Sequence, residues 1–228
     1  MKLLRHLPNA LTCGNLLCGC FGLVWVVQHP IEQAAYFVWA ACVFDFLDGF
    51  AARALSVASP IGKELDSLAD MVSFGLLPSI VMYYMIHAVA DLPVLAYLGF
   101  SIAVFSALRL AQFNIAENQK DSFIGVPTPA TALFLTAIPF LPQPLDAVRD
   151  YSSALIAITL LFSFLLVSPW ELFALKFKNF TWADNQMRFT FLLLAVLLLF
   201  WWRAGAIPII ILLYIAISLV SRVLVSRK

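Results

Sequence analysis

Residues 44–75 read FDFLDGFAARALSVASPIGKELDSLADMVSFG and hold four carboxylates close together: Asp45, Asp48, Asp66 and Asp70. The chain around them is 63% hydrophobic and only 12% charged. A charged side chain at membrane depth costs about 2.5–3.5 kcal/mol on insertion scales, so such groups normally face a cavity or a partner. The stretch therefore predicts a charged site inside a largely apolar molecule.

The whole chain has the composition of a membrane protein. Its mean hydropathy is +0.94, and 228 residues with so little charge cannot coat a soluble globule. Apolar runs near the length that crosses a bilayer predict eight helices, at 10–28, 32–55, 66–90, 93–116, 127–142, 152–169, 189–203 and 206–222. We expect an all-α polytopic bundle. The net charge of +1 argues against nucleic acid as a partner.

Lysine and arginine predict the orientation, because they concentrate in cytoplasmic loops. With the N-terminus inside, one side of the membrane receives Lys2, Arg5, Arg53, Lys63, Arg109, Lys120, Lys176, Lys178, Arg188, Arg222, Arg227 and Lys228. The opposite side keeps only Arg149 and Arg203. We therefore expect both termini in the cytoplasm, which requires an even number of spans.

Helical spacing places the four carboxylates on two faces that also carry small residues. The second predicted helix gathers Asp45, Asp48, Gly49, Ala52 and Arg53 on one face, and the third gathers Gly62, Asp66 and Asp70. Oxygen ligands suit Mg²⁺, Mn²⁺ or Ca²⁺ better than zinc. Mg²⁺ often completes its shell with phosphate oxygens, and small residues leave room for a ligand. The pattern predicts a phosphate-bearing substrate.

Purely structural salt bridges are the competing interpretation of these carboxylates. Arg53 and Lys63 cannot neutralise four aspartates, so this interpretation lacks cations. Lys63 and Glu64, in the loop before the third predicted helix, are interpreted as a solvated ion pair. A cation transporter would also need membrane carboxylates, but it would not explain the interleaved glycines and alanine.

The spacing D-x-x-D-G-x-x-A-R-x₈-G-x-x-x-D-x-x-x-D, from Asp45 to Asp70, resembles the signature of the CDP-alcohol phosphatidyltransferase family without departure. The resemblance implies a six-helix membrane core, usually dimeric, that takes CDP-diacylglycerol and a small alcohol and releases CMP. It implies a catalytic core at 1–169, followed by a polar cytoplasmic connection at 170–188 and an accessory helix pair at 189–228, all within one domain at 1–228.

The same resemblance implies roles for the motif residues. Two Mg²⁺ or Mn²⁺ ions would be held by Asp45, Asp48, Asp66 and Asp70. Asp70 would also be the general base on the acceptor hydroxyl. The cytidine diphosphate would contact Gly49, Ala52, Arg53 and Gly62.

Three further segments resemble the bacterial and archaeal phosphatidylserine synthases of this family. They are LPNALTCGNLLCGCFGL at 7–23, ELDSLADMVSFGLLPS at 64–79, and SALRLAQFN at 106–114 followed by FIGVPTPA at 123–130. One departure is Gln112, where a basic residue often stands. The resemblance implies L-serine as the acceptor and a bacterial inner membrane. Glycerol 3-phosphate or an inositol phosphate is the alternative acceptor, although those would demand more basic residues than Arg53 and Arg109.

Two features outside the motif have open interpretations. Thr12, Asn15, Gly19 and Gly22 share a face of the first helix, which predicts either close helix packing or a wall of the nucleotide pocket, with Asn15 as its ligand contact. Arg109 either forms a bidentate pair with the carboxylate of the acceptor or extends to lipid headgroups.

Overall fold

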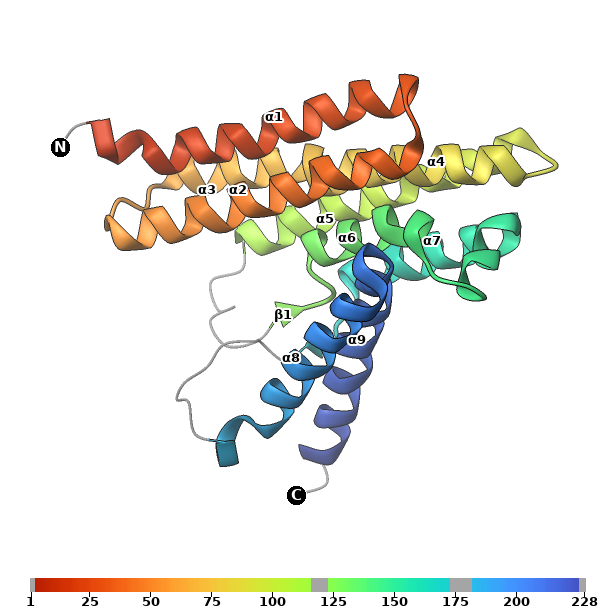
Figure 1. Ribbon diagram of the computed structural model, residues 1–228. Coiled ribbons are helices and arrows are strands. Elements are labelled where there is room, and N and C mark those ends of the chain that lie inside the picture. The colour runs from red at the N-terminus through yellow and green to blue at the C-terminus, as the bar shows by residue number, and fades with distance from the viewer. Residues whose placement is uncertain (1–2, 116–122, 173–181, 226–228) are drawn as a thin grey trace.

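The computed structural model describes residues 3–115, 123–172 and 182–225 (Figure 1). Short 3₁₀ segments separate many of the α-helices, and η3 is a π-helical turn. The elements are η1 (Leu3–His6), α1 (Leu7–Gln28), η2 (Ile31–Gln33), α2 (Ala34–Ala54), α3 (Pro60–Asp70), η3 (Met71–Leu76), α4 (Leu77–Val89), η4 (Pro93–Phe100), α5 (Ser101–Ile115), β1 (Phe123–Ile124), α6 (Thr128–Ala137), η5 (Ile138–Phe140), η6 (Leu145–Asp150), α7 (Ser152–Val167), β2 (Glu171–Leu172), α8 (Trp182–Trp202), η7 (Arg203–Gly205) and α9 (Ala206–Val225).

The predicted all-α polytopic bundle is confirmed, with helix at each of the eight predicted positions. Within the described ranges, five apolar helical stretches are long enough to cross a membrane, the last running from Arg188 through η7 to Leu219. Two others, Thr128–Phe140 and Ser152–Val167, are apolar but shorter. The protein is therefore an integral, multi-pass membrane protein.

The third helix begins earlier than its apolar run predicts. It starts at Pro60 and continues through η3 and α4 to Val89. Ser59 is its N-cap, accepting a hydrogen bond from the Gly62 amide (3.1 Å), and Pro60 fits the first turn because it has no amide hydrogen to satisfy. The apolar run predicted a start at 66 because polar residues of the first turn do not register as membrane sequence.

A tight turn reverses the chain between α2 and α3. Ser56 adopts a positive φ of 53°. The Val57 amide bonds the Ala52 carbonyl (3.0 Å) and the Ser56 amide bonds the Arg53 carbonyl (3.2 Å), which is the Schellman pattern of a helix C-terminus. The turn lies a few residues after the first carboxylate pair, so it brings α3 back toward that pair.

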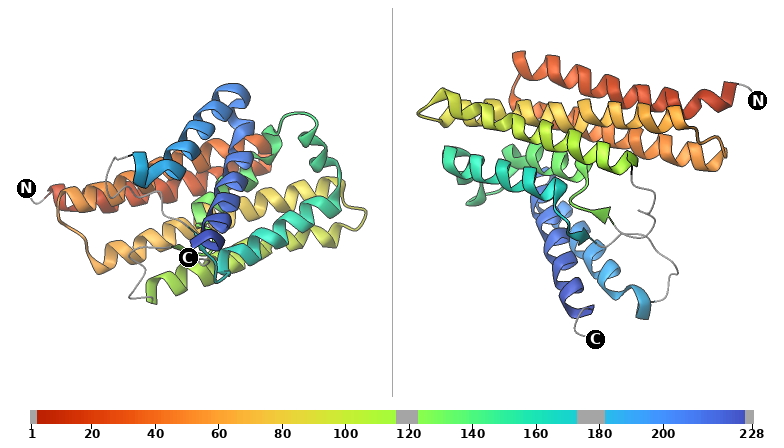
Figure 2. Two further views of the ribbon diagram at one scale, coloured as in Figure 1. Left: turned by 90° about the horizontal axis from the view of Figure 1, so that it is seen from below. Right: turned by 180° about the vertical axis from the view of Figure 1, so that it is seen from behind.

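The long helices α1, α2, α3–α4 and α5 lie side by side, and α7 runs in a similar direction (Figures 1 and 2). In Figure 1 the start of α1, the α2–α3 turn and the end of α5 lie toward the left, whereas the end of α4 lies toward the right. The core is centred on α4 and η3, where Phe74, Leu77, Met82 and Ile86 are fully buried. All four carboxylates belong to α2 and α3, the two helices that the α2–α3 turn joins.

A short antiparallel ladder joins the segments that precede α6 and follow α7. Phe123 pairs with Leu172 and Ile124 with Glu171. Gly125 adopts a φ of 73°, and a Cβ there would lie 2.4 Å from the Leu166 carbonyl oxygen. The neighbouring Val126 amide caps the Leu165 carbonyl at the end of α7 (2.9 Å). Backbone geometry therefore explains the glycine of the FIGVPTPA segment, because no other residue fits at position 125.

The α8–α9 pair is inclined steeply to the other helices (Figures 1 and 2). The turn between α8 and α9 packs closely against η5, because a Cβ on Gly205 would lie 2.2 Å from the Phe140 carbonyl oxygen. Ile211 and Ile215 of α9 belong to the hydrophobic core, so the pair expected to be accessory is anchored in the core. Of the connection predicted at 170–188, residues 173–181 lie outside the described residues, which resume at Trp182 after β2.

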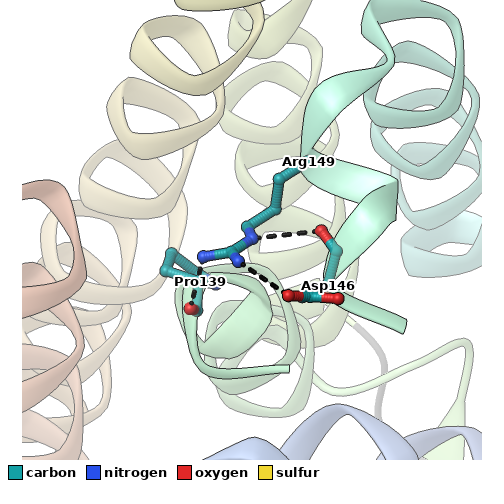
Figure 3. Close-up of polar contacts among 3 residues, drawn as sticks. All are labelled: Pro139, Asp146 and Arg149. Carbon is teal, nitrogen blue, oxygen red and sulfur yellow. Dashed lines mark hydrogen bonds and ion pairs between the residues drawn. The ribbon is translucent and has the colours of Figure 1, made fainter. Parts of the chain in front are cut away.

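Arg149, one of the two cations expected on the outer side, links parts of the segment between α6 and α7 through hydrogen bonds (Figure 3). It donates to the carbonyl oxygens of Pro139 (2.9 Å) and Asp146 (3.1 Å) and pairs with the Asp146 carboxylate at 3.5 Å. A local structural role thus accounts for a cation at this end. The expected cytoplasmic cations Lys2, Lys120, Lys176, Lys178, Arg227 and Lys228 lie outside the described residues.

Candidate active site

Three of the four aspartates converge. One oxygen from each of Asp45 and Asp48 of α2 and Asp66 of α3 lies within 4.8 Å of the others. Asp66 Oδ1 is buried and has no hydrogen-bond partner among the described residues. An orphaned, buried carboxylate oxygen is costly unless a cation or donor satisfies it. The donor set therefore fits a hard divalent cation, in agreement with the prediction from sequence.

A cavity of about 230 Å³ opens beside these carboxylates. It lies between the start of α1, the end of α2 and the start of α3. Its lining residues are Pro8, Asn9, Thr12, Asp48, Gly49, Ala52, Val57, Ala58, Ser59, Gly62, Lys63 and Asp66. The predicted nucleotide residues Gly49, Ala52 and Gly62 are thus together on its wall, with two of the carboxylates.

The two glycines of this wall permit close approaches. A Cβ on Gly49 would lie 3.2 Å from Arg53 Nη1, so the exposed Arg53 guanidinium lies back over Gly49. Arg53 itself is not among the residues that line the cavity. A Cβ on Gly62 would lie 3.1 Å from Ser59 Oγ and 3.2 Å from Asn9 Oδ1. Small residues at these positions therefore keep polar atoms within reach of the cavity.

The polar face of α1 combines both of the interpretations left open by the sequence. At one end the Thr12 hydroxyl donates to Asp48 Oδ2 (2.6 Å) and lines the cavity. At the other end Gly19 and Gly22 pack closely, since added Cβ atoms would lie 2.5 Å from Ser73 Oγ and Leu77 Cδ2. The face is a pocket wall at Thr12 and a packing surface at the glycines.

Asn15, the expected nucleotide contact, lies between these ends and bonds a carboxylate. Its Nδ2 donates to Asp70 Oδ1 (2.9 Å), and it is not among the residues that line the cavity. Its backbone carbonyl accepts a hydrogen bond from Ser73 Oγ (2.9 Å). Asn15 thereby orients Asp70 from α1.

Asp70 is separate from the group formed by Asp45, Asp48 and Asp66. It is 8% exposed, and it is not one of the three carboxylates whose oxygens lie within 4.8 Å of one another. It is followed at once by the π-helical turn η3, a distortion that is frequent at functional sites. A single amide donor from Asn15 leaves carboxylate lone pairs free to accept a proton.

Arg109 is buried in α5 with 9% exposure, which disagrees with a side chain that extends to lipid headgroups. Its Nε has no hydrogen-bond partner among the described residues. It interacts electrostatically with Asp70 and with Tyr214 of α9. A buried guanidinium with a free donor beside Asp70 is arranged to receive an anion.

Several pocket residues were missed by the sequence reasoning. Asn9 precedes Thr12 by one helical turn, so its spacing could have revealed it. Ser59 was seen only as part of a loop. Lys63 and Glu64 do not form the expected solvated pair: Lys63 Nζ donates to the Asn114 carbonyl (2.8 Å), and Glu64 Oε2 accepts from Asn114 Nδ2 (3.1 Å). No local signal pairs residues so distant in sequence.

The fold and this site define a class of membrane enzyme. The sequence model of the CDP-alcohol phosphatidyltransferase family matches residues 5–165, more than half of the chain and all of the site described above. The chain therefore belongs to the CDP-alcohol phosphatidyltransferase family. This family depends in general on divalent metals, and the acidic group Asp45, Asp48 and Asp66 could hold such an ion.

The curated relatives are more specific in name. A Bacillus subtilis protein named CDP-diacylglycerol–serine O-phosphatidyltransferase is 35% identical over 143 residues, which cover 62% of this chain and 80% of that protein. A Helicobacter pylori protein of the same name is 33% identical over 56% of this chain and 54% of its own length. One from Saccharomyces cerevisiae is 32% identical over 55% of this chain and half of its own.

Proposed function

We propose that this protein transfers the phosphatidyl group of CDP-diacylglycerol to the hydroxyl of L-serine, giving phosphatidylserine and CMP. The observation that carries the proposal is the convergence of Asp45, Asp48 and Asp66 beside a cavity walled by small residues. The shared name of the relatives supports serine as the acceptor.

The cytidine diphosphate of the substrate occupies the cavity along Gly49, Ala52 and Gly62, with Arg53, which lies over Gly49, near the phosphates. The lipid tails remain in the bilayer. Asp45, Asp48 and Asp66 would hold two Mg²⁺ or Mn²⁺ ions, with Asp70 at the edge of this acidic group. Such ions would supply positive charge that offsets the diphosphate and the departing phosphate.

Asp70 is the general base. Its carboxylate, oriented by Asn15, removes the proton of the serine hydroxyl. The resulting alkoxide attacks the phosphorus that carries the diacylglycerol, and the bond to the CMP oxygen breaks. Arg109 holds the serine carboxylate through its guanidinium, whose Nε has no partner among the described residues and which interacts electrostatically with Asp70.

The setting is the inner membrane of a bacterium, with both termini and the active site on the cytoplasmic side and a homodimer as the assembly. Charge distribution supports the orientation. The family resemblance supports the dimer, which mass photometry in detergent or nanodiscs would test.

The decisive experiment supplies purified protein with CDP-diacylglycerol, Mg²⁺ and a panel of acceptors: L-serine, glycerol 3-phosphate, inositol 1-phosphate and water. We expect CMP release and a new lipid with serine alone. Asp70→Asn should lower the rate by at least about 100-fold, the scale of a lost general base. Asp91→Asn, at an exposed carboxylate between α4 and η4, is the matched control and should keep full activity.

If product formed with a phosphorylated acceptor and not with serine, the proposed acceptor would be wrong, but the proposed transfer reaction would stand. Absence of CMP release with every acceptor would overturn the transferase itself. Full activity of Asp70→Asn would contradict the assignment of Asp70 as the general base.

A further inference from the structure

Asn114, in the last turn of α5, binds three residues of α3 at once. Its backbone carbonyl accepts a hydrogen bond from Lys63 Nζ (2.8 Å). Its side-chain Oδ1 accepts from Ser67 Oγ (3.1 Å), and its Nδ2 donates to Glu64 Oε2 (3.1 Å). One asparagine thus uses its backbone carbonyl and both ends of its amide on the first two turns of a single neighbouring helix.

The three bonded residues bracket a carboxylate of the site. Lys63 and Glu64 precede Asp66 on α3, and Ser67 follows it directly. Asp66 lies about 100° around the helix from Ser67, and its carboxylate approaches those of Asp45 and Asp48. Because α3 is rigid over this length, a bond to Ser67 and Glu64 fixes the rotation of the helix and therefore the position of the Asp66 carboxylate.

The chemistry of these bonds makes asparagine specific at position 114. Glu64 needs a donor and Ser67 offers one, so the partner must both donate and accept. An aspartate would lose the donor and oppose the Glu64 charge, and an alanine would lose both contacts. Gln112, on the same helix, is exposed and serves as a neutral comparison.

We propose that Asn114 is a positioning residue for the metal site: it fixes the start of α3 so that Asp66 meets Asp45 and Asp48, and it keeps Lys63 at the mouth of the cavity. The inference rests on the metal site of the proposed function. It predicts that loss of the Asn114 amide weakens metal binding before it affects any step that follows.

The test measures Mn²⁺ binding to purified protein by electron paramagnetic resonance of the free ion, without substrate. Asn114→Ala should weaken binding by about tenfold, the scale seen when a residue that orients a ligand is lost. Gln112→Ala should bind as the wild type does. Unfolding temperatures in the same detergent check that each variant is folded.

A reciprocal exchange provides the rescue. In the double variant Asn114→Asp with Glu64→Gln, the new glutamine amide can donate to the new aspartate, Ser67 keeps its acceptor, and the net charge is unchanged. We expect Mn²⁺ affinity within about threefold of wild type, whereas Asn114→Asp alone should be weakened like Asn114→Ala. The exchange also tests the proposal if Asn114→Ala fails to fold.

The outcomes separate the two proposals. A wild-type protein that binds no Mn²⁺ would overturn the metal site and this inference with it. A wild type that binds, together with an Asn114→Ala variant that binds equally well, would overturn the positioning role alone. A folded exchange variant that stays as weak as Asn114→Asp would also overturn it, because the hydrogen bonds would then not be the cause.

Discussion

At the scale of single residues, each charged group of the site is left incompletely satisfied. Among the described residues, Asp48 receives a side-chain hydrogen bond from Thr12, and Asp70 receives one from Asn15. Arg109 Nε and Asp66 Oδ1 have no hydrogen-bond partner in the part of the chain that the structure describes. Unpaired buried polar atoms cost about 1–3 kcal/mol each, so their presence in a folded core favours ligands that complete them.

Arg109→Lys tests the acceptor subsite at this scale. Lysine keeps the charge but loses the planar pair of donors that matches a carboxylate. We expect the KM for serine to rise by about tenfold, equivalent to about 1.4 kcal/mol, with the KM for CDP-diacylglycerol unchanged. Steady-state kinetics of CMP release would measure both constants.

Arg203→Lys is the matched control for this change, because Arg203 is exposed at the corner before α9. An unchanged serine KM in Arg109→Lys would contradict the assignment. An equal rise in both KM values would indicate a general disturbance of the site.

At the scale of elements, the first helix is the part that joins packing to chemistry. Its glycines bring α1 against η3 and α4, and the same register places Thr12 on Asp48 and Asn15 on Asp70. The sequence revealed this face by its spacing. It did not reveal which carboxylates the face would meet, because that depends on how α1 crosses two other helices.

Gly19→Ala tests this close packing. The new Cβ would lie 2.5 Å from Ser73 Oγ and 2.9 Å from Ser73 Cα, so the backbones must separate. We expect destabilisation by about 1–3 kcal/mol, the usual cost of overpacking. Thermal unfolding in detergent should show a lower midpoint, and activity should fall as Thr12 and Asn15 move.

The adjacent Cys20→Ala is the control, since Cys20 is exposed and lies about 100° around α1 from Gly19. A Gly19→Ala protein with the stability and activity of the wild type would contradict close packing between α1 and η3 at this position.

At the scale of the whole molecule, the alternation of helices places the carboxylates and the Arg149 corner at opposite ends of the bundle. The motif turn between α2 and α3 lies at one end, and the segment between α6 and α7 lies at the other (Figure 1). In a membrane these ends face opposite compartments. The proposed orientation puts the motif end in the cytoplasm.

Cysteine labelling tests this orientation. In a background where the native cysteines are alanine, single cysteines are introduced as Ala58→Cys after α2 and Asp150→Cys before α7, both at exposed positions. A membrane-impermeant maleimide should label position 150 in intact spheroplasts and position 58 only in inverted vesicles. The reverse pattern would invert the topology, and labelling of both positions from one side would contradict the alternation of the spans.

The sequence by itself determined the class of molecule, the eight helical segments and the aspartates that converge at the candidate metal site. These follow from local properties: the length of apolar runs and the spacing of carboxylates and glycines along a helix. Local spacing also predicted that Asp45 and Asp48 share one face of the second helix and that Asp66 and Asp70 share one face of the third. It placed small residues on the same two faces.

Only the tertiary structure decided the partners of those aspartates and the direction of the last helices. Thr12 meets Asp48 across 36 positions of sequence, Asn15 meets Asp70 across 55, and Asn114 meets Lys63 across 51. The inclination of α8–α9 depends on Gly205 fitting against the Phe140 carbonyl. Such contacts arise from the packing of distant helices, whose crossing no short stretch of sequence specifies.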